Sequence, residues 1–351
     1  MNIDFYKNKR VFLTGHTGFK GVWLAKVLMQ LGAKVCGYSL PPEKNQPLFA
    51  ASGVPDEITS IYGDIRDFKL LSQALEKFSP DIVIYMAAQA LVRPSYMEPL
   101  LTYSTNVMGT VNLLEAVRLF GKVSSVVNVT TDKVYKNVEE SGKRYVETDV
   151  LDGFDPYSNS KSCSELIGSC YRRSFGIPLS TCRAGNVIGG GDFSKNRIIP
   201  DCIRAVNTGD IISIRNSNST RPYQYVLEPI FAYLLTAKSQ YLNPSLCDAY
   251  NVGPDNDECV STRNIVNIFC HIWGAGAEYE IKEEENSLHE AKWLGLNADK
   301  IRNVLGWKKV YSIEEAVERT VAGYKAMAEN NMKNFMEQEI NKFVDSIEYD
   351  I

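Results

Sequence analysis

The chain is poor in histidine and lacks the cysteine pairs of metal sites. It has only three histidines (His16, His271 and His289), and no two of its eight cysteines form a CxxC pair. Because structural zinc sites draw on clustered cysteine and histidine, we expect no metal centre. In a chain of 351 residues, isolated cysteines indicate buried, reduced thiols. We therefore expect a cytoplasmic protein.

Long apolar runs and an excess of basic residues are also missing. No run approaches the roughly 18 apolar residues of a membrane span, and residues 1–9 lack the apolar core of a signal peptide. The charged residues are 38 Lys+Arg and 42 Asp+Glu, a net charge of −4 with no basic block. This balance argues against nucleic acid as a partner. An anionic small ligand needs only a few local positive groups and stays open.

The first half of the chain alternates strand and helix patterns. Short apolar runs at 11–14, 81–87 and 125–130 are typical of parallel strands that are buried on both faces. Amphipathic segments between the runs predict helices, so we expect an α/β fold with a doubly wound, parallel Rossmann-type sheet and a smaller C-terminal substrate domain. The predicted units are a nucleotide domain at 1–186 with later chain crossings back into it, a substrate domain at 187–331 and a helix-prone tail without a motif at 332–351.

A glycine-rich turn follows the first predicted strand. Gly15, Gly18 and Gly21 have the spacing GxxGxxG between a strand and a helix. Such a turn lets backbone N–H groups and a helix N-terminus approach a pyrophosphate, which predicts a dinucleotide site. The end of the second strand, residues 37–40, has no acidic residue to bind a ribose, so NAD and NADP both stay open. Asp64 is placed to bind adenine or, like Asp67, to cap a helix.

Tyr157 and Lys161 stand four residues apart in a predicted helix, which puts both on one face. A nearby ammonium favours phenolate and lowers the tyrosine pKa, so the pair can remove a hydroxyl proton as hydride leaves for a nicotinamide. Asp132 and Lys133 follow the strand at 125–130, at the sheet edge where ligands bind. They form either a solvated turn or an acid and a base that would permit elimination.

These segments resemble the extended short-chain dehydrogenase/reductases that act on nucleotide sugars. The resemblance runs from the first strand to about residue 325 and is strongest to the 4,6-dehydratases of CDP-glucose. The segments that carry it include GHTGFKG (15–21), NVTTDKVY (128–135), DPYSNSKSCSEL (155–166), RAGNVIGGGDF (183–193) and IRNSNSTRPYQYVLEP (214–229).

The resemblance implies a redox-neutral lyase with NAD as cofactor. Tyr157 would take the C4 hydroxyl proton, with Thr131 on the C4 oxygen and Lys161 on the nicotinamide ribose. Lys133 would remove the C5 proton or stabilise the enolate, and Asp132 would protonate the departing C6 hydroxyl. The implied cofactor-binding residues are Gly15, Thr17, Gly18, Phe19, Gly21, Asp64, Ile65, Ala87, Tyr157 and Lys161. The implied substrate-binding residues are Arg93, Asn186, Arg215, Arg221 and Glu290.

Three alternatives remain. The substrate could be another nucleotide hexose, the enzyme could be a nucleotide-sugar epimerase or reductase, which does not need Asp132 and Lys133, or the chain could be a non-catalytic NAD-sensing protein. The resemblance also implies a homodimer or larger homo-oligomer through the helices at 99–120 and 155–175. It further implies a place in deoxysugar biosynthesis, such as that of lipopolysaccharide O-antigen.

Overall fold

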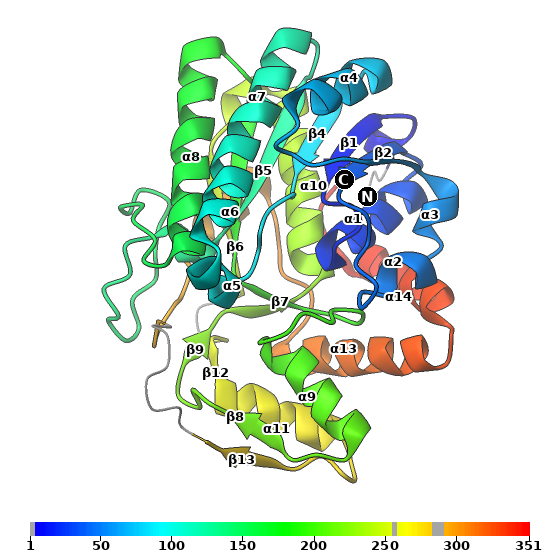
Figure 1. Cartoon of the computed structure of the whole chain (residues 1–351), viewed down its shortest axis with the longest axis vertical. Coiled ribbons are helices and arrows are strands. Elements are labelled where there is room, and N and C mark those ends of the chain that lie inside the picture. The colour runs from blue at the N-terminus through cyan, green and yellow to red at the C-terminus, as the bar shows by residue number, and fades with distance from the viewer. Residues whose placement is uncertain (1–3, 255–257, 283–290) are drawn as a thin grey trace.

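A seven-stranded parallel sheet forms the centre of the computed structural model, which describes residues 4–254, 258–282 and 291–351 (Figure 1). The strand order is β11-β6-β5-β4-β1-β2-β3, with every neighbouring pair parallel. This confirms the predicted Rossmann-type sheet. Its strands are β1 (Arg10–Thr14), β2 (Lys34–Ser39), β3 (Thr59–Tyr62), β4 (Ile82–Tyr85), β5 (Ser125–Thr131), β6 (Leu179–Ala184) and β11 (Ala249–Val252).

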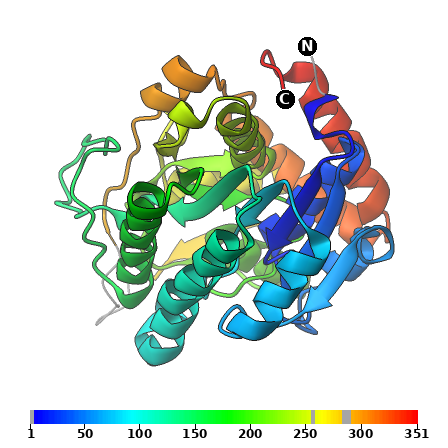
Figure 2. The same ribbon diagram turned by 90° about the horizontal axis from the view of Figure 1, so that it is seen from above.

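Helices cover both faces of the sheet, as Figure 2 shows from above. Val11 and Leu13 of β1 belong to one core cluster, whereas Phe12 between them belongs to the other. Successive strand residues point to opposite faces, so a strand covered on both sides must be apolar throughout. One face carries α1 (Phe19–Gln30) and α10 (Leu227–Leu242), and the other carries α4 (Phe68–Phe78), α7 (Gly109–Phe120) and α8 (Pro156–Phe175).

The helix predicted at 99–120 exists, but a π-helical turn interrupts it. The segment consists of α6 (Pro99–Tyr103), the π-turn Ser104–Met108 and α7. Within the turn, Asn106 accepts a hydrogen bond from the Gln89 N–H (2.8 Å) and donates to the Ser160 hydroxyl (2.8 Å). A π-turn re-aims the helix locally. Here it ties the loop after β4 to α8. A short helix, α5 (Val92–Met97), lies just before the segment.

The smaller C-terminal part lies beyond the carboxyl ends of the sheet strands (Figure 1). It contains α9 (Ile198–Thr208), α11 (Thr262–Trp273) and α13 (Ile313–Ala328). Its two-stranded sheets pair β7 (Asn186–Ile188) with β10 (Tyr223–Tyr225), β9 (Thr220–Arg221) with β12 (Val260–Ser261), and β8 (Ile212–Ile214) with β13 (Tyr279–Ile281). The chain returns to the main sheet through α10 and β11. Further short helices are α2 (Leu48–Ala51), α3 (Val54–Glu57) and α12 (Asp299–Leu305).

The tail forms a helix, α14 (Met332–Ser346), that packs on the core. Met336, Ile340 and Phe343 lie on one face at helical spacing and are buried. The neighbouring face carries Glu337, whose carboxylate pairs with the buried Lys26 of α1 at 2.7 Å. The segment without a motif is therefore part of the folded unit. None of the helices in the described part of the chain is long and apolar enough to cross a membrane.

Candidate active site

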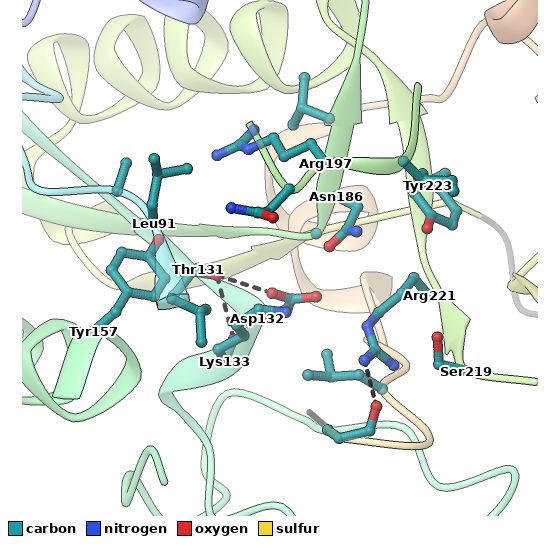
Figure 3. Close-up of a pocket in the computed structure, with 18 of the residues that line it drawn as sticks. Leu91, Thr131, Asp132, Lys133, Tyr157, Asn186, Arg197, Ser219, Arg221 and Tyr223 are labelled. Carbon is teal, nitrogen blue, oxygen red and sulfur yellow. Dashed lines mark hydrogen bonds between the residues drawn. The ribbon is translucent and has the colours of Figure 1, made fainter. Parts of the chain in front are cut away.

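A cavity of about 320 Å³ opens where β5 and β6 end (Figure 3). Parallel sheets of this kind bind ligands at the carboxyl ends of their strands. The cavity brings together eight of the predicted site residues, from both parts of the chain: Thr131, Asp132, Lys133, Tyr157, Arg93, Asn186, Arg215 and Arg221. Glu290, also predicted, lies outside the described residues.

The end of β5 holds a buried carboxyl group. Thr131 is the last residue of the strand, and its hydroxyl donates a hydrogen bond to Oδ1 of Asp132 at 2.9 Å. Asp132 is only 1% exposed, and its Oδ2 has no hydrogen-bond partner within residues 4–254, 258–282 and 291–351. A buried polar atom without a partner is costly. Because Asp132 lines the cavity, a ligand hydroxyl or water there can supply the missing partner.

Helix α8 positions Tyr157 and Lys161 beside this carboxyl group. Asp155 caps the helix by accepting from the Ser158 N–H at 3.0 Å, and Tyr157 follows within the first turn. Tyr157 lines the cavity, whereas Lys161 is buried one turn further along and donates to the carbonyl of Val129 at 2.9 Å. The helix thus holds the phenol at the cavity wall and the ammonium behind it.

Burial controls the protonation of this pair. It raises the pKa of Tyr157 to about 12, although the charge of Arg197 and a hydrogen bond with Thr131 act in the lowering direction. Burial also lowers the pKa of Lys161 to about 8, against the charge of Glu165. The net shift of the tyrosine pKa in the structure is therefore upwards, and the lowering of this pKa by Lys161 stays a prediction. Loss of hydration around the phenolate outweighs the nearby positive charges.

Positive groups gather on the side of the cavity formed by the C-terminal part. Arg221 is buried and donates to the carbonyls of Thr220 (2.9 Å) and Ala291. Arg215 forms a loose ion pair of 3.9 Å with Asp201 of α9. Several guanidinium groups around one cavity suit an anionic ligand such as a diphosphate.

Two further basic residues line the cavity that the sequence reasoning did not single out. Arg197 lies just before α9 and forms an ion pair of 3.5 Å with Asp192. Lys20 lies in the first turn of α1, and burial together with the charges of Arg197 and Lys161 lowers its pKa to about 7. Lys20 lies within the segment 15–21 and Arg197 lies shortly after the segment 183–193, both of which contain motifs. No pattern in the sequence distinguishes these two residues from ordinary surface charges.

The glycine-rich turn has the shape of a pyrophosphate cradle. Gly15 adopts a positive φ of 76°, and a Cβ at Gly21 would come within 2.0 Å of the Gly15 carbonyl oxygen. Gly18 is the N-cap residue of α1, and having no side chain it cannot cap the first N–H groups of the helix. Those donors remain available to an anion at the positive end of the helix dipole. The turn therefore fits the dinucleotide predicted from its spacing.

The remaining predicted cofactor residues surround this turn. Ala87 donates its N–H to the Thr14 hydroxyl at 3.1 Å, and the hydroxyls of Thr17 and Ser39 lie 2.5 Å apart. Asp67 caps α4, the role that the sequence had left open for it or for Asp64. The side chain of Asp64 pairs instead with Arg66 at 2.6 Å. The last two predicted residues lie nearby: Ile65 is buried, and Phe19 begins α1.

Comparison with known proteins gives consistent matches over most of the chain. The family model described as GDP-mannose 4,6 dehydratase matches residues 12–320. A CDP-glucose 4,6-dehydratase of Salmonella typhimurium is 43% identical over 333 residues, which cover 92% of each chain. A dTDP-glucose 4,6-dehydratase of Xanthomonas campestris is 27% identical and covers 89% of this chain and 92% of its own.

Solved structures share the same fold. The UDP-glucose 4-epimerase of Thermus thermophilus, in complex with NAD, superposes with a TM-score of 0.79 at 27% identity, covering 90% of this chain and 99% of its own. The dTDP-glucose 4,6-dehydratase of Bacillus anthracis, also in complex with NAD, has a TM-score of 0.78 at 21% identity and covers 92% of this chain and 98% of its own.

Proposed function

The chain belongs to the GDP-mannose 4,6-dehydratase family, within the extended short-chain dehydrogenase/reductases, and on that premise we propose that it is an NAD-dependent 4,6-dehydratase of CDP-glucose. The observation that carries the proposal is the cavity that holds Tyr157 and the buried carboxyl of Asp132 together. Oxidation of a sugar hydroxyl by a bound nicotinamide needs one protein group, a base such as Tyr157. A second, buried acid in the same cavity supports elimination of water as well.

The first step removes the C4 hydroxyl proton. Tyr157 is the base for this proton, and the Thr131 hydroxyl hydrogen-bonds the C4 oxygen. Because the pKa of Tyr157 is about 12 in the buried site, the phenolate needs further positive charge close by. The buried ammonium of Lys161, one helical turn after Tyr157, would supply this charge. When bound, NAD accepts hydride from C4 and later returns it to C6.

The second step eliminates water between C5 and C6. The C4 ketone acidifies the C5 proton. Lys133 either removes this proton or stabilises the enolate that forms when the proton leaves. Asp132 donates a proton to the C6 hydroxyl, which leaves as water. After hydride returns to C6, a proton is added at C5, and the product is a 4-keto-6-deoxy sugar. The buried position of Asp132 keeps bulk water away from this acid.

The binding groups support a nucleoside diphosphate sugar. The guanidinium groups of Arg221 and Arg215, with the Asn186 amide, line the cavity from the C-terminal part, where we place the substrate diphosphate. The glycine-rich turn and the open N-terminus of α1 hold the pyrophosphate of NAD. The cytidine assignment rests on the relative that is 43% identical over nearly its full length.

We also infer that the enzyme is a homodimer. The helical segment at 92–120 and α8 expose large apolar side chains: Met97 at 81%, Leu100 at 83% and Leu166 at 57%. Apolar groups on adjacent helices favour a helix-to-helix interface between two copies.

The eight cysteines are free thiols, which suits the reducing cytoplasm. A 4-keto-6-deoxy product would supply deoxysugar biosynthesis, such as that of O-antigen.

A substrate carrying deuterium at C4 tests the reaction class. The dehydratase is expected to release a 4-keto product that absorbs ultraviolet light in alkali and carries the deuterium at C6. An epimerase would leave the label at C4 and form no keto sugar. CDP-glucose is compared with dTDP-, UDP- and GDP-hexoses, and a keto product from another nucleotide alone would overturn the cytidine assignment. No keto product from any of them would overturn the dehydratase.

A further inference from the structure

A buried ion pair lies behind the wall of the active site. Glu165 of α8 and Arg183 of β6 form a bidentate contact, with Arg183 Nε at 2.9 and 3.0 Å from the two carboxylate oxygens and Nη2 at 2.7 Å. Thr130 donates to Oε1 of Glu165 at 2.5 Å. All three residues are at most 4% exposed. Taking two charges out of water is costly, so such a pair is weak evidence for stability alone.

The remaining nitrogen of the Arg183 guanidinium binds groups outside α8. Its Nη1 donates to the Tyr135 hydroxyl at 2.8 Å and to the carbonyl of Glu147 at 2.9 Å. The Tyr135 hydroxyl in turn donates to Oδ1 of Asn251 at 2.6 Å. The guanidinium is thus anchored from both ends, and the carboxylate of Glu165 cannot change position without breaking several hydrogen bonds.

This carboxylate stands one helical turn after Lys161. Residues four apart share a helix face, so Glu165 and Lys161 face the same strands. Lys161 donates to the carbonyl of Val129, and Thr130, the next residue of β5, binds Glu165. The strand therefore contacts the ammonium and the carboxylate through consecutive residues. Burial lowers the pKa of Lys161 to about 8, and the charge of Glu165 opposes that shift.

Other charged and titratable groups also face Lys161 from the elements around it. Lys20 interacts with it electrostatically, and the Tyr85 ring lies 6.0 Å from its ammonium nitrogen. The groups to consider are Tyr157 and Glu165 on α8, Tyr85 on β4, Asp132 after β5, Lys20 on α1, and Cys182 and Arg183 on β6. Glu165 is the acidic group among them that acts on the Lys161 pKa and lies outside the cavity.

We propose that Glu165 is a positioning residue for the reaction: its carboxylate, held by Arg183 and Thr130 one helical turn after Lys161, keeps the Lys161 ammonium protonated behind Tyr157. The inference rests on the proposed function for its role in catalysis, because a neutral Lys161 could not stabilise the phenolate. The structural part, the protonation of Lys161, can be measured without cofactor or substrate.

Lysine labelled with ¹³C at Cε reports this protonation in the full chain. The Lys161 signal is assigned as the one lost in Lys161→Arg, and its titration midpoint is followed by NMR. We expect a midpoint near 8 in the parent chain. In Glu165→Gln it falls by about one pH unit or more, the usual effect of losing one close opposite charge. An unchanged midpoint in folded Glu165→Gln overturns the proposal.

Two variants separate charge from packing. Glu165→Asp restores the carboxylate and is expected to bring the midpoint back towards that of the parent chain. Tyr135→Phe removes two hydrogen bonds from the same network but no charge near Lys161, so its midpoint should match that of the parent chain. A fall in Tyr135→Phe as large as in Glu165→Gln would mean that the network acts through packing alone and would overturn the proposal.

Glu165→Gln leaves Arg183 buried without a counter-charge and can fail to fold. The double variant Glu165→Gln/Arg183→Met replaces the ion pair by uncharged groups, a change that buried pairs tolerate. Because Glu165, and not Arg183, is the charge that acts on the Lys161 pKa, we expect the midpoint to fall in the double variant too. A midpoint equal to that of the parent chain contradicts the proposal.

Activity is then a separate readout. The pH above which kcat falls should move with the Lys161 midpoint only if the chain is the proposed dehydratase, because Lys161 loses its proton above that midpoint. If no nucleotide sugar is converted but the NMR midpoint falls, the proposed function fails and the assignment of Glu165 to Lys161 holds. If a nucleotide sugar is converted and the Lys161 midpoint is unchanged, the proposed function holds and the assignment of Glu165 to Lys161 fails.

Discussion

The Thr131 hydroxyl lies between two functional groups: it donates to Oδ1 of Asp132 at 2.9 Å, and it is hydrogen-bonded to the Tyr157 phenol. One threonine therefore connects the proposed base of the oxidation with the proposed acid of the elimination. The other carboxylate oxygen of Asp132, Oδ2, has no hydrogen-bond partner among the described residues. Substitutions at these positions should separate the two half-reactions.

Asp132→Asn should separate them most clearly. An amide keeps the shape of the side chain but cannot protonate the C6 hydroxyl, so oxidation at C4 proceeds and elimination slows by roughly 10²-fold or more. Reduced nicotinamide is expected to build up after mixing with CDP-glucose and to be visible by its absorbance. Asp149→Asn, at an exposed hydrogen bond to Val146, is the control and should behave like the parent chain. Full turnover by Asp132→Asn would remove Asp132 from the mechanism.

Tyr157→Phe should abolish oxidation itself. The ring still fills its buried position, but no group remains to take the C4 hydroxyl proton, so turnover falls by about 10²- to 10⁴-fold. No reduced nicotinamide should appear. Circular dichroism and the affinity for CDP-glucose should stay close to those of the parent chain, which distinguishes lost chemistry from lost folding. Reduced nicotinamide formed at the parental rate would show that another group is the base.

Arg221→Gln tests the diphosphate site. Loss of a charge-assisted hydrogen bond costs about 1.5–3 kcal/mol, so KM for the nucleotide sugar should rise about 10- to 100-fold with a smaller change in kcat. Arg204→Gln is a matched control, because Arg204 pairs with Asp201 on α9 without lining the cavity. Its KM should be unchanged. A kcat defect without a KM defect in Arg221→Gln would place the arginine elsewhere in the mechanism.

Charges on the exposed helix face should dissociate the dimer. Leu100→Glu together with Met97→Glu replaces two of the most exposed large apolar side chains of the described residues by carboxylates. We expect sedimentation to show a monomer in the variant and a dimer in the parent chain at equal concentration, with the same circular dichroism. Leu242→Glu, on an exposed residue far from that face, is the control. A monomeric parent chain would contradict the inferred dimer.

The stability of the fold should depend on pH through Glu228. Burial raises the pKa of this carboxyl to about 8 from the usual 4.5, so the folded chain keeps a proton that the unfolded chain has lost. The contribution of this proton is present below about pH 4.5 and is lost as the pH rises through about 8. Glu228→Gln removes this dependence and can still accept the N–H groups of Val310 and Tyr311.

Urea unfolding at both ends of this range measures the effect. Relative to Glu228→Gln, the parent chain should lose a few kcal/mol of unfolding free energy between mildly acidic and mildly alkaline pH. Glu314→Gln, at an exposed position in the first turn of α13, is the control. Parallel pH curves for parent and Glu228→Gln would show that the carboxyl titrates as in the unfolded chain.

Local patterns predicted most elements of the nucleotide-binding part. The amphipathic spacing of α4 and α11, and their caps Asp67 and Ser261, are short-range signals that a sequence shows directly. The π-turn inside 99–120 was not predicted. It depends on Asn106 bonding to Gln89 and Ser160, which are distant in sequence. The short strands of the C-terminal part likewise carry little periodicity.

The sequence alone determined the parallel sheet, the glycine-rich turn and the set of reactive residues, because apolar runs and motif spacing are local properties. Only the tertiary structure decided which groups share the cavity, since Lys20, Tyr157 and Arg197 come from separate elements. It also decided their charge states: burial raises the pKa of Tyr157 and lowers that of Lys161, and burial depends on packing rather than on pattern.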